Sequence, residues 1–447
     1  ALIITTNDND AAPNDTNGDV TIHGGTTALV LGNSTIDGDL TLTSTATGTA
    51  GITDTGTLNI RGTTTISASG VDVTLNSAAN NFQGSIAING SDVIVVNAYA
   101  TTDLGASTVT GTYTLTASGG VIDSGALAIT GVTTVSAGGD VTLNTVTNNF
   151  QGAVKIAANN VEVVDAGAID LGASTVTGTY RVTATAGGDI TNSGVLTISG
   201  GAIFKAASGQ SIYLNESNIF SSTVAFTTPS GNLANVTVRD TTDFDLAALT
   251  LSGDLIVTST GGSITDSGAL AISGTSSFTT STSDEDITLD IATHAFTGAV
   301  ELNTTGSTGH ATVDGGTTVL DIGASSVGGD LTLNSGHASG ITDSGTVTVG
   351  GNLIVINDVS NGDINMGSLA VDGTIALATS GSGGDVTVVN DAGLDFATSS
   401  IGGDLTATAT SGNISDSGTL TVTGATDITL GIEPILTVSG ATSATDL

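Results

Sequence analysis

The amino-acid sequence predicts an all-β fold, a right-handed parallel β-helix (β-solenoid), with about 18 rungs in about six long repeats of roughly 70–77 residues. Three observations predict it. The chain repeats itself from end to end, apolar and polar residues alternate in short runs such as VTLN and LTIS, and Gly, Asn, Asp and Ser separate these runs. Alternation of period two is typical of half-buried strands, and parallel crossover connections are right-handed by default. We therefore expect a coil of short strands with essentially no helix.

A corner motif of the Asp-Ser-Gly type gives the clearest measure of the repeat. Its acidic position recurs after steps of 69, 69, 74, 77 and 73 residues, with asparagine in the third copy. We interpret these positions as structural corners, at Asp54, Asp123, Asn192, Asp266, Asp343 and Asp416. Each long unit divides into turns of about 20 to 28 residues, so three rungs are expected in each repeat.

Two further landmarks follow the same spacing. Phrases such as DVTLNSAANNFQG place an aromatic residue in one recurring position, which predicts large apolar plugs in a core of small residues; these core plugs are Phe82, Phe150, Phe220 and Phe296. The phrase DLGASTVTG begins at Asp103 and at Asp170, and related phrases begin at Asp245, Asp321 and Asp395. A sandwich array would need antiparallel hairpins and linkers between domains, and propeller blades of about 40 to 50 residues match neither period.

The charge balance excludes several classes of partner. The chain carries 42 acidic residues and a net charge of −37, with only five fixed positive charges, on Arg61, Lys155, Arg181, Lys205 and Arg239. Nucleic-acid binding needs a basic face, and anionic lipid attracts basic segments, so neither partner is expected. No apolar run approaches the roughly 20 residues that a membrane helix needs, so membrane insertion is not expected either.

The first residues are more acidic than the rest. We expect residues 1–19 to form an acidic N-terminal segment or cap, and residues 20–447 to form a single continuous β-solenoid. Asp8, Asp10, Asp15 and Asp19 lie close together in this segment and are candidate calcium ligands, because calcium prefers clustered oxygen ligands. Their spacing matches neither an EF-hand loop nor the nonapeptide of calcium-bound β-rolls, so a solvated cap remains the alternative. No other cofactor is expected.

The corner acids also have two interpretations. Each could bind a cation between rungs, or each could close its own turn through its side chain, as Asp often does. Equivalent corners three rungs apart would be separated by about 14 Å, too far for one ion to bridge. The structural interpretation is therefore preferred.

Catalysis needs an acid, a base and an electrophile that converge. The histidines His23, His294, His310 and His337 are far apart in the sequence, and no serine lies in a nucleophile elbow. Some β-helices are polysaccharide-cleaving enzymes, but five scattered bases do not predict a groove for anionic sugar. We expect no enzyme.

The phrases GGDVTL, GGDLTL, SITDSGALAISG and DSGTLTVTG resemble those of the large bacterial surface adhesins of the filamentous-haemagglutinin type and related β-strand-repeat proteins. The resemblance covers nearly the whole chain. It implies export to the bacterial cell surface, a right-handed β-helix, and roles in adhesion, biofilm or surface coats. The first residues lack the basic and then apolar pattern of a signal peptide, so we expect a processed product or an interior piece of an exported protein.

The function expected from these observations is structural and extracellular. The chain would be a rod-like repeat segment of a surface adhesin or fibre, without an enzymatic activity. Open ends of a coil leave backbone N–H and C=O groups unpaired, so self-association end to end into filaments or a surface sheath is expected. The alternative is a glycan- or receptor-binding adhesin module that acts through loops such as residues 227–244.

Overall fold

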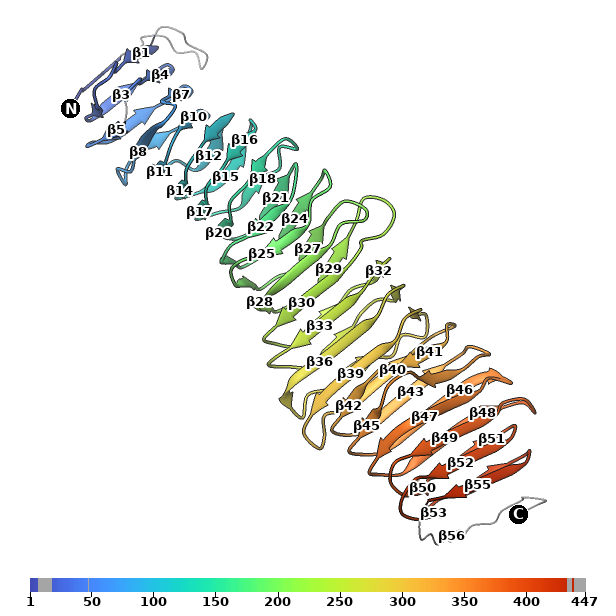
Figure 1. The fold of residues 1–447 in the computed structure, drawn as a ribbon. Helices are drawn as coiled ribbons and strands as arrows, with labels where there is room; N and C mark the ends of the chain where they lie inside the picture. The colour runs from blue at the N-terminus through green and yellow to red at the C-terminus, as the bar shows by residue number, and fades with distance from the viewer. Residues whose placement is uncertain (7–17, 47, 432–435, 438–447) are drawn as a thin grey trace. The chain divides into compact units, whose positions relative to one another are not determined.

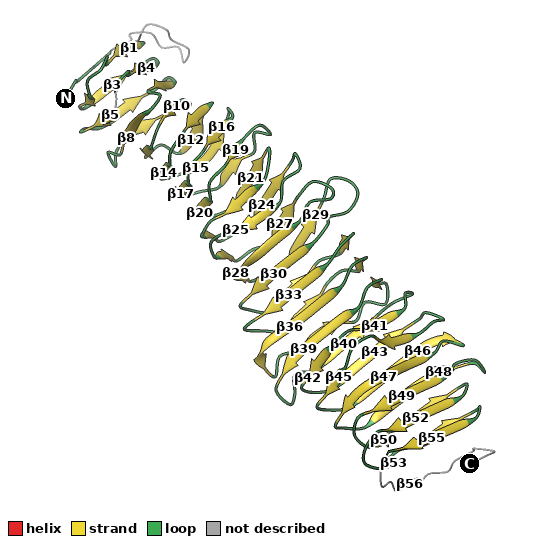
Figure 2. Cartoon of the chain, in the orientation of Figure 1, coloured by secondary structure: helices red, strands yellow, loops and turns green. Residues whose placement is uncertain are grey.

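The structure is a computed structural model that describes residues 1–6, 18–46, 48–431 and 436–437. This part of the chain consists of strands, turns and bends, without a helix (Figure 2). All listed strand pairs are parallel, and the strands stack as a β-solenoid of about 19 turns (Figure 1). The predicted fold class and number of rungs are thereby confirmed. The described residues include no helix long and apolar enough for a membrane crossing.

The chain divides into two compact units. Unit 1 comprises Ala1–Ser222 and Thr227–Ser230, and unit 2 comprises Thr223–Phe226 and Gly231–Leu447. Each is described by itself. The prediction of a single continuous solenoid over residues 20–447 stays a prediction.

A segment in the middle of unit 1 shows how the coil is built. The chain passes alternately through two parallel sheets, here called sheet I and sheet II. Sheet I contains β11 (Val93–Asn97), β14 (Tyr113–Ala117), β17 (Thr133–Ala137) and β20 (Val154–Ala158). Sheet II contains β12 (Thr101–Leu104), β13 (Ser107–Val109), β15 (Gly120–Asp123), β16 (Leu127–Ile129), β18 (Val141–Leu143) and β19 (Asn149–Phe150). A half-turn is therefore either single, with one strand, or split, with two short strands and a bend between them.

Strand register explains why period-two alternation is so regular. Val93 pairs with Tyr113, which pairs with Thr133, so a turn here takes 20 residues. Along each strand the inward residues are buried and the next ones face outward, as in β14. Val95 and Leu115 are fully buried and stack on each other, one turn apart. Such burial of small branched side chains contributes about 1.5–3 kcal/mol for each residue and drives the stacking of turns.

The two kinds of half-turn combine in a fixed order. One single strand is followed by three split half-turns, each with a single half-turn after it: β11 precedes the split pairs β12/β13, β15/β16 and β18/β19. Two single half-turns, β20 and β21 (Val161–Asp165), then follow each other, and the next split pair lies in sheet I. We call the first single strand of each repeat, such as β11 and β21, the switch strand, because the split half-turns change sheet there.

The expectation of three rungs per repeat is wrong, because each repeat contains seven half-turns, or about three and a half turns. Asp54 lies in sheet I, at the end of β5 (Gly48–Asp54), whereas Asp123 ends β15 in sheet II. Asn192, in β25 (Ile190–Asn192), is in sheet I again. In unit 2, β34 (Ile264–Asp266) and β53 (Ile414–Asp416) share one sheet and β44 (Ile341–Asp343) lies in the other. Successive corners of a unit therefore face opposite sides.

Several glycine corners are explained by close approach of consecutive turns. A Cβ atom on Gly131 would lie 2.4 Å from the carbonyl oxygen of Gly111, and one on Gly152 would lie 2.4 Å from that of Gly131. None of the three has a positive φ. The sequence analysis left the choice of glycine to turn propensity; here glycine is required because any side chain would collide with the turn beneath.

Candidate functional sites at the corners and switch strands

The corner side chains join each turn to the next one. Asp54 Oδ1 accepts a hydrogen bond from Asn76 N (2.9 Å), and Asp54 Oδ2 accepts one from Asn80 Nδ2 (2.6 Å). Asn80 Oδ1 in turn accepts from Leu58 N, four residues after the aspartate (2.9 Å). The aspartate thus binds the turn above it, and the asparagine of that turn binds back. This corner is an interturn clamp.

The same clamp recurs in the second repeat. Asp123 accepts from Asn144 N (2.9 Å) and from Asn148 Nδ2 (2.7 Å), while Asn148 Oδ1 accepts from Leu127 N (2.8 Å). The hypothesis that these aspartates close their own turn is therefore wrong for Asp54 and Asp123. The sequence reasoning also missed Asn80 and Asn148, although both precede a core phenylalanine by two residues in the repeated letters NNF.

The third and fifth repeats vary the clamp. Asn192 Nδ2 donates to Asn218 Oδ1 (2.9 Å), so amides replace the carboxylate there. In the fifth repeat Asp343 accepts directly from Gly367 N and Ser368 N (2.7 Å each). The last corner, Asp416, lies in β53.

The fourth repeat places a histidine where the others have asparagine. Leu270 N donates to His294 Nδ1 (2.9 Å), so the ring proton belongs on Nε2. His294 Nε2 lies 3.2 Å from Asp266 Oδ2, and both side chains are 0% exposed. The two atoms are close but are not aligned as a hydrogen bond. A histidine in this tautomer nevertheless presents an acceptor and a donor on the same sides as the asparagine amide.

The core plugs occupy equivalent positions. Phe82, Phe150, Phe220 and Phe296 are all at most 1% exposed. Each one pairs in register with an isoleucine of the preceding turn, at Ile60, Ile129, Ile198 and Ile272. In the fifth repeat Val371 takes this position and pairs with Val349. The role of these residues is thus to fill the end of a split half-turn.

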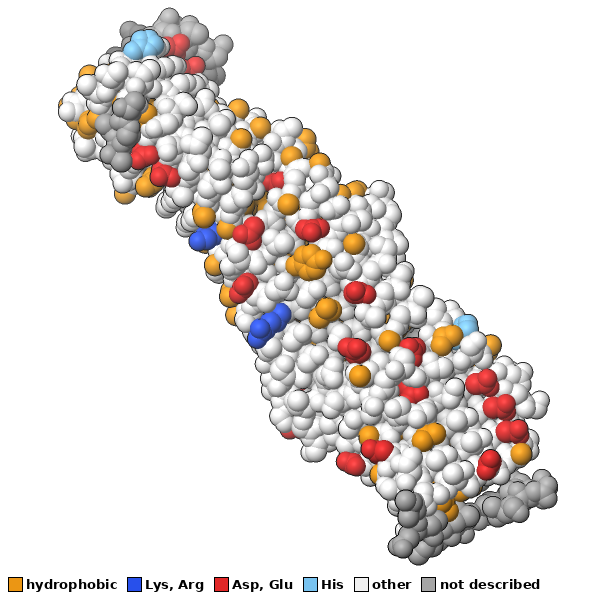
Figure 3. Space-filling view, viewed as in Figure 1, with side chains coloured by type: hydrophobic (Ala, Val, Ile, Leu, Met, Phe, Trp, Pro, Cys, Tyr) orange, Lys and Arg blue, Asp and Glu red, His pale blue; other side chains and the backbone are white. Residues whose placement is uncertain are grey.

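Many acidic residues at another corner form hydrogen-bonded ladders. Asp385 accepts from Asp404 N (2.8 Å), and Asp404 accepts from Ala425 N (2.7 Å), one turn after another. In unit 1 the backbone and side chain of Thr112 donate to Asp92, which lowers the pKa of this carboxyl. Figure 3 shows many acidic and few basic side chains on the face in view. The acidic composition therefore has a partly structural origin.

The candidate calcium segment is only partly described. Asp8, Asp10 and Asp15 lie outside the described residues. Asp19 Oδ1 accepts from Asp39 N (2.8 Å), so Asp19 begins a corner ladder. Within the described ranges, no three His, Asp or Glu side chains are grouped so that they could hold a metal ion. Calcium binding by the N-terminal segment stays a prediction.

The ends of the switch strands carry buried polar side chains that the sequence analysis did not single out. Asn97, at the end of β11, brackets Phe82: its Oδ1 accepts from Phe82 N and its Nδ2 donates to Phe82 O, both at 3.0 Å. Asn390, which ends β49 (Val386–Asn390), does the same at Val371 N and O, at 2.9 and 3.1 Å. Because the next turn has only a single strand there, the amide replaces the missing strand partner. The signal was available as V-x-V-x followed by Asn or Asp.

Asp165 holds this position in β21 with a carboxylate. Its Oδ2 accepts from Phe150 N (2.6 Å) and its Oδ1 accepts from Gly167 N (2.6 Å). Burial raises the pKa of Asp165, although the two backbone hydrogen bonds oppose the shift. Unlike Asn97, an ionised carboxylate has no hydrogen to donate to the carbonyl below it.

We expect Asp165→Asn to stabilise unit 1 by about 1–2 kcal/mol at pH 7, because an amide restores the donor and removes a buried charge. A raised folded pKa means that the folded state takes up a proton before the unfolded state does as the pH falls. The native protein should therefore gain on the variant below pH 7, and the difference should narrow toward pH 4. Urea unfolding at several pH values measures it. An equal or larger advantage of the variant at pH 4 would contradict this assignment.

Tyr113 offers a second pH-dependent prediction. Its phenol is 1% exposed and its hydroxyl has no hydrogen-bond partner, so burial raises its pKa far above the usual value. Above about pH 10 an unfolded tyrosine ionises while this one stays protonated, so stability is lost as the pH rises. We expect Tyr113→Phe to be at least as stable at pH 7 and to lose less stability between pH 9 and 11. The control is Tyr99→Phe, at a tyrosine that is 37% exposed, which should follow the native protein.

A notch opens in each unit where the split half-turns begin after a switch. In unit 1, β22 (Ile169–Leu171) pairs with β20 beneath it only at Val154 and Leu171. Ile169 and Asp170 therefore extend past the end of the lower strand. The resulting cavity of about 480 Å³ is lined by residues that include Gln151, Ala168, Asp170, Asp189, Thr191 and Gln210. Asp170 Oδ2 accepts from Ser193 Oγ (2.6 Å).

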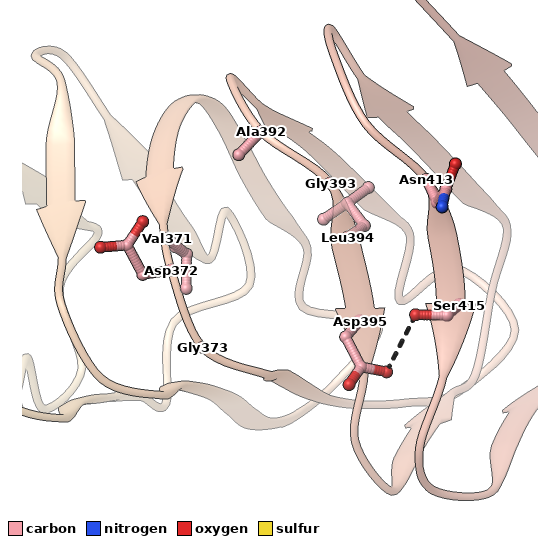
Figure 4. A pocket seen from close by; sticks show the side chains of 9 residues that line it. All are labelled: Val371, Asp372, Gly373, Ala392, Gly393, Leu394, Asp395, Asn413 and Ser415. Carbon is pink, nitrogen blue, oxygen red and sulfur yellow. Dashed lines mark hydrogen bonds between the residues drawn. The ribbon is translucent and has the colours of Figure 1, made fainter. Parts of the chain in front are cut away.

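The equivalent place in unit 2 has the same construction. There β50 (Leu394–Phe396) pairs with β48 (Ile375–Ser380) only at Phe396 and Ile375. The cavity has about 320 Å³ and is lined by residues that include Asp372, Ala392, Asp395, Asn413 and Ser415. Figure 4 shows these side chains on three successive segments, with Ser415 Oγ 3.4 Å from Asp395 Oδ1. Asp170 and Asp395 belong to the recurring DLGASTVTG-like phrase, so this sequence landmark marks the notch.

A family model described as repeats of unknown function (DUF5649) matches residues 17–89, 90–157, 158–227, 233–303, 308–365 and 383–445. Each match begins three residues before a strand that opens a repeat: β1 (Val20–His23), β11, β21, β30 (Val236–Asp240), β40 (Ala311–Asp314) or β49. No curated protein and no solved structure matches the chain. Because the six matches cover most of the sequence and coincide with the structural repeat, the chain belongs to the DUF5649 family of repeats of unknown function.

Proposed function

We propose that the chain is a structural, extracellular repeat segment of a bacterial surface adhesin or fibre, with self-association end to end as its mode of assembly. The observation that carries the proposal is the interturn clamp. It joins neighbouring turns at Asp54 and Asp123 through side chains, in addition to the backbone ladders. Chemistry that could be spent on a ligand is thereby used to strengthen the stack of turns.

The surface supports an extracellular setting. A net charge of −37 keeps copies apart at low ionic strength, and salt or divalent cations screen it. The resemblance to filamentous-haemagglutinin-type adhesins points the same way. Absence of cysteine fits a fold whose stability comes from repetition and not from disulfides.

Electron microscopy of the purified chain, with and without added calcium, tests this function. We expect thin filaments or sheets of uniform width, which grow longer with protein concentration. Particles that stay single at every concentration, salt level and calcium level would contradict self-assembly. Lengthening only with calcium would support assembly and would assign a role to the acidic surface.

A glycan- or receptor-binding module is the second candidate. The loop at residues 227–244, originally considered for this role, contains Arg239, which is exposed in β30. Replacement of residues 228–235 by a short corner from another repeat tests it. Loss of binding to a glycan array or to host cells would support the loop, and unchanged binding would reject it.

A further inference from the structure

We propose that the two notches at Asp170 and Asp395 are binding sites for single sugar units of a neutral saccharide. The inference goes beyond the structural role proposed above and does not depend on filament formation. It also places the site away from the loop at residues 227–244. Three observations carry it: the shape of the notches, their shared chemical groups, and their charge.

The shape follows from the switch of the split half-turns. At both places a strand extends past the end of its lower neighbour, because pairing is confined to one residue of each strand. The volumes, about 480 and 320 Å³, lie at the small end of ligand pockets, which span about 300–1,000 Å³. The notches are therefore formed by the backbone architecture and exist before any ligand arrives.

The two notches contain the same inventory of groups in exchanged positions. On the lower turn, unit 1 has Gln151 where unit 2 has Asp372. On the upper turn, unit 1 has Asp189 where unit 2 has Asn413. With Asp170 or Asp395 on the middle turn, each set contains two carboxylates and one amide. A pure fold requirement at either position does not explain why the exchange preserves the sum.

This inventory favours a ligand with several hydroxyl groups. Carboxylates only accept hydrogen bonds, and an amide both accepts and donates. Hydroxyls of a sugar can satisfy all of them, since each one donates once and accepts as well. Ser193 and Ser415 hold one oxygen of the middle carboxylate from the turn above. That contact orients the group and leaves it acceptor capacity for a ligand.

The charge restricts the class of sugar. Neither notch is lined by lysine or arginine, and each has two aspartates. Uronate, sulfate and phosphate groups would lie against like charges and are disfavoured. A neutral hexose meets no such penalty, and an amine-bearing sugar would be tolerated.

A steric block provides the sharpest test. Ala168 and Ala392 line the two notches at equivalent positions and are exposed or half-buried. The double variant Ala168→Trp, Ala392→Trp fills both without removing a carboxylate. Thr116→Trp, at an exposed residue of β14, is the matched control. The labelled full-length chain is applied to arrayed neutral, amine-bearing, uronate-containing and sulfated oligosaccharides.

We expect binding to neutral oligosaccharides, weakened about tenfold or more in the double variant and unchanged in the control. Each single variant should remove about half of the bound saccharide at saturation. If the tryptophan variants fold poorly, as judged by circular dichroism, Asp170→Ala with Asp395→Ala tests the same sites. The expected loss is again about tenfold, since two charge-assisted hydrogen bonds disappear.

Three results would overturn the proposal. They are no binding to any neutral oligosaccharide, binding that survives both pairs of substitutions, and binding only to a lysine-rich peptide or to anionic glycans. Electron microscopy of the same variants separates this outcome from the structural role. Filaments that persist in a variant without saccharide binding leave that role intact, whereas lost filaments with retained binding would reject the structural role alone.

Discussion

Phe150→Ala should lower the stability of the middle of unit 1 by about 3–5 kcal/mol, the usual cost of deleting a buried phenylalanine ring. Phe150 is 1% exposed, stacks in register on Ile129 and ends a split half-turn. The surrounding core consists of small branched side chains, so little can move in to fill the space. Because turns contact mainly their neighbours, the loss should be local.

Native-state hydrogen exchange is the appropriate measurement. Amides of β16, β19 and the neighbouring turns should lose protection, and amides several turns away should lose much less. Gln151→Ala changes the exposed neighbour and serves as the control, with an expected effect within about 0.5 kcal/mol. Phe150→Val copies the fifth repeat and should cost less than Phe150→Ala. A uniform loss throughout the chain would contradict the description of separable turns.

His294→Ala should destabilise unit 2 by about 3–5 kcal/mol, because it leaves Asp266 buried without its partner. It also removes the acceptor for Leu270 N, a hydrogen bond of 2.9 Å. His294→Asn should lose much less than His294→Ala. That variant recreates the Asp–Asn clamp of the first two repeats, where the amide lies 2.6–2.7 Å from the carboxylate.

Urea unfolding of the three proteins at pH 7 checks this order. The conservative comparison is His310→Asn, since His310 Nδ1 accepts from Asp330 N in a corner that is 42–44% exposed. This change should have a small effect. If His294→Asn is as unstable as His294→Ala, the histidine does not act as a substitute for the clamp asparagine.

The sequence determines much of this fold through strong local patterns. Alternation in VTLN-type runs locates strands and their inward residues, and Val95 and Leu115 are buried as the pattern requires. The corners and core phenylalanines could be located because whole phrases recur around them. Repetition of text does not reveal parity, however. Whether Asp123 follows Asp54 after three or three and a half turns depends on the number of residues in a turn, which irregular bends obscure.

The clamp partners and the notch were harder to predict for the same reason. Asn80 and Asp54 are 26 residues apart, and their contact follows only once the register between turns is known. Asp165 and Asn97 act where strand pairing ends, and no periodicity signals such an end. Asp170 could be found as a recurring letter, but its place beside a cavity depends on the change of sheet at β21. Side-chain roles that arise from backbone topology thus require the structure.

The central claim is the turn of 20 residues in β11–β17, from which a repeat of about three and a half turns follows. Thr116 and Ser136 are exposed, lie in adjacent turns and pair in register. Because the chain has no cysteine, Thr116→Cys with Ser136→Cys creates a single candidate disulfide. Paired residues of neighbouring strands are close enough for this bond, whereas a diagonal pair is not.

Mild oxidation of Thr116→Cys, Ser136→Cys should therefore give a complete intramolecular disulfide, detected by mass spectrometry of a peptide digest. The control, Thr114→Cys with Ser136→Cys, is offset by two residues and should stay reduced. That result would establish the register and, with it, the alternation of corners and notches between the two sheets. Disulfide formation in the offset pair but not in the matched pair would contradict the account.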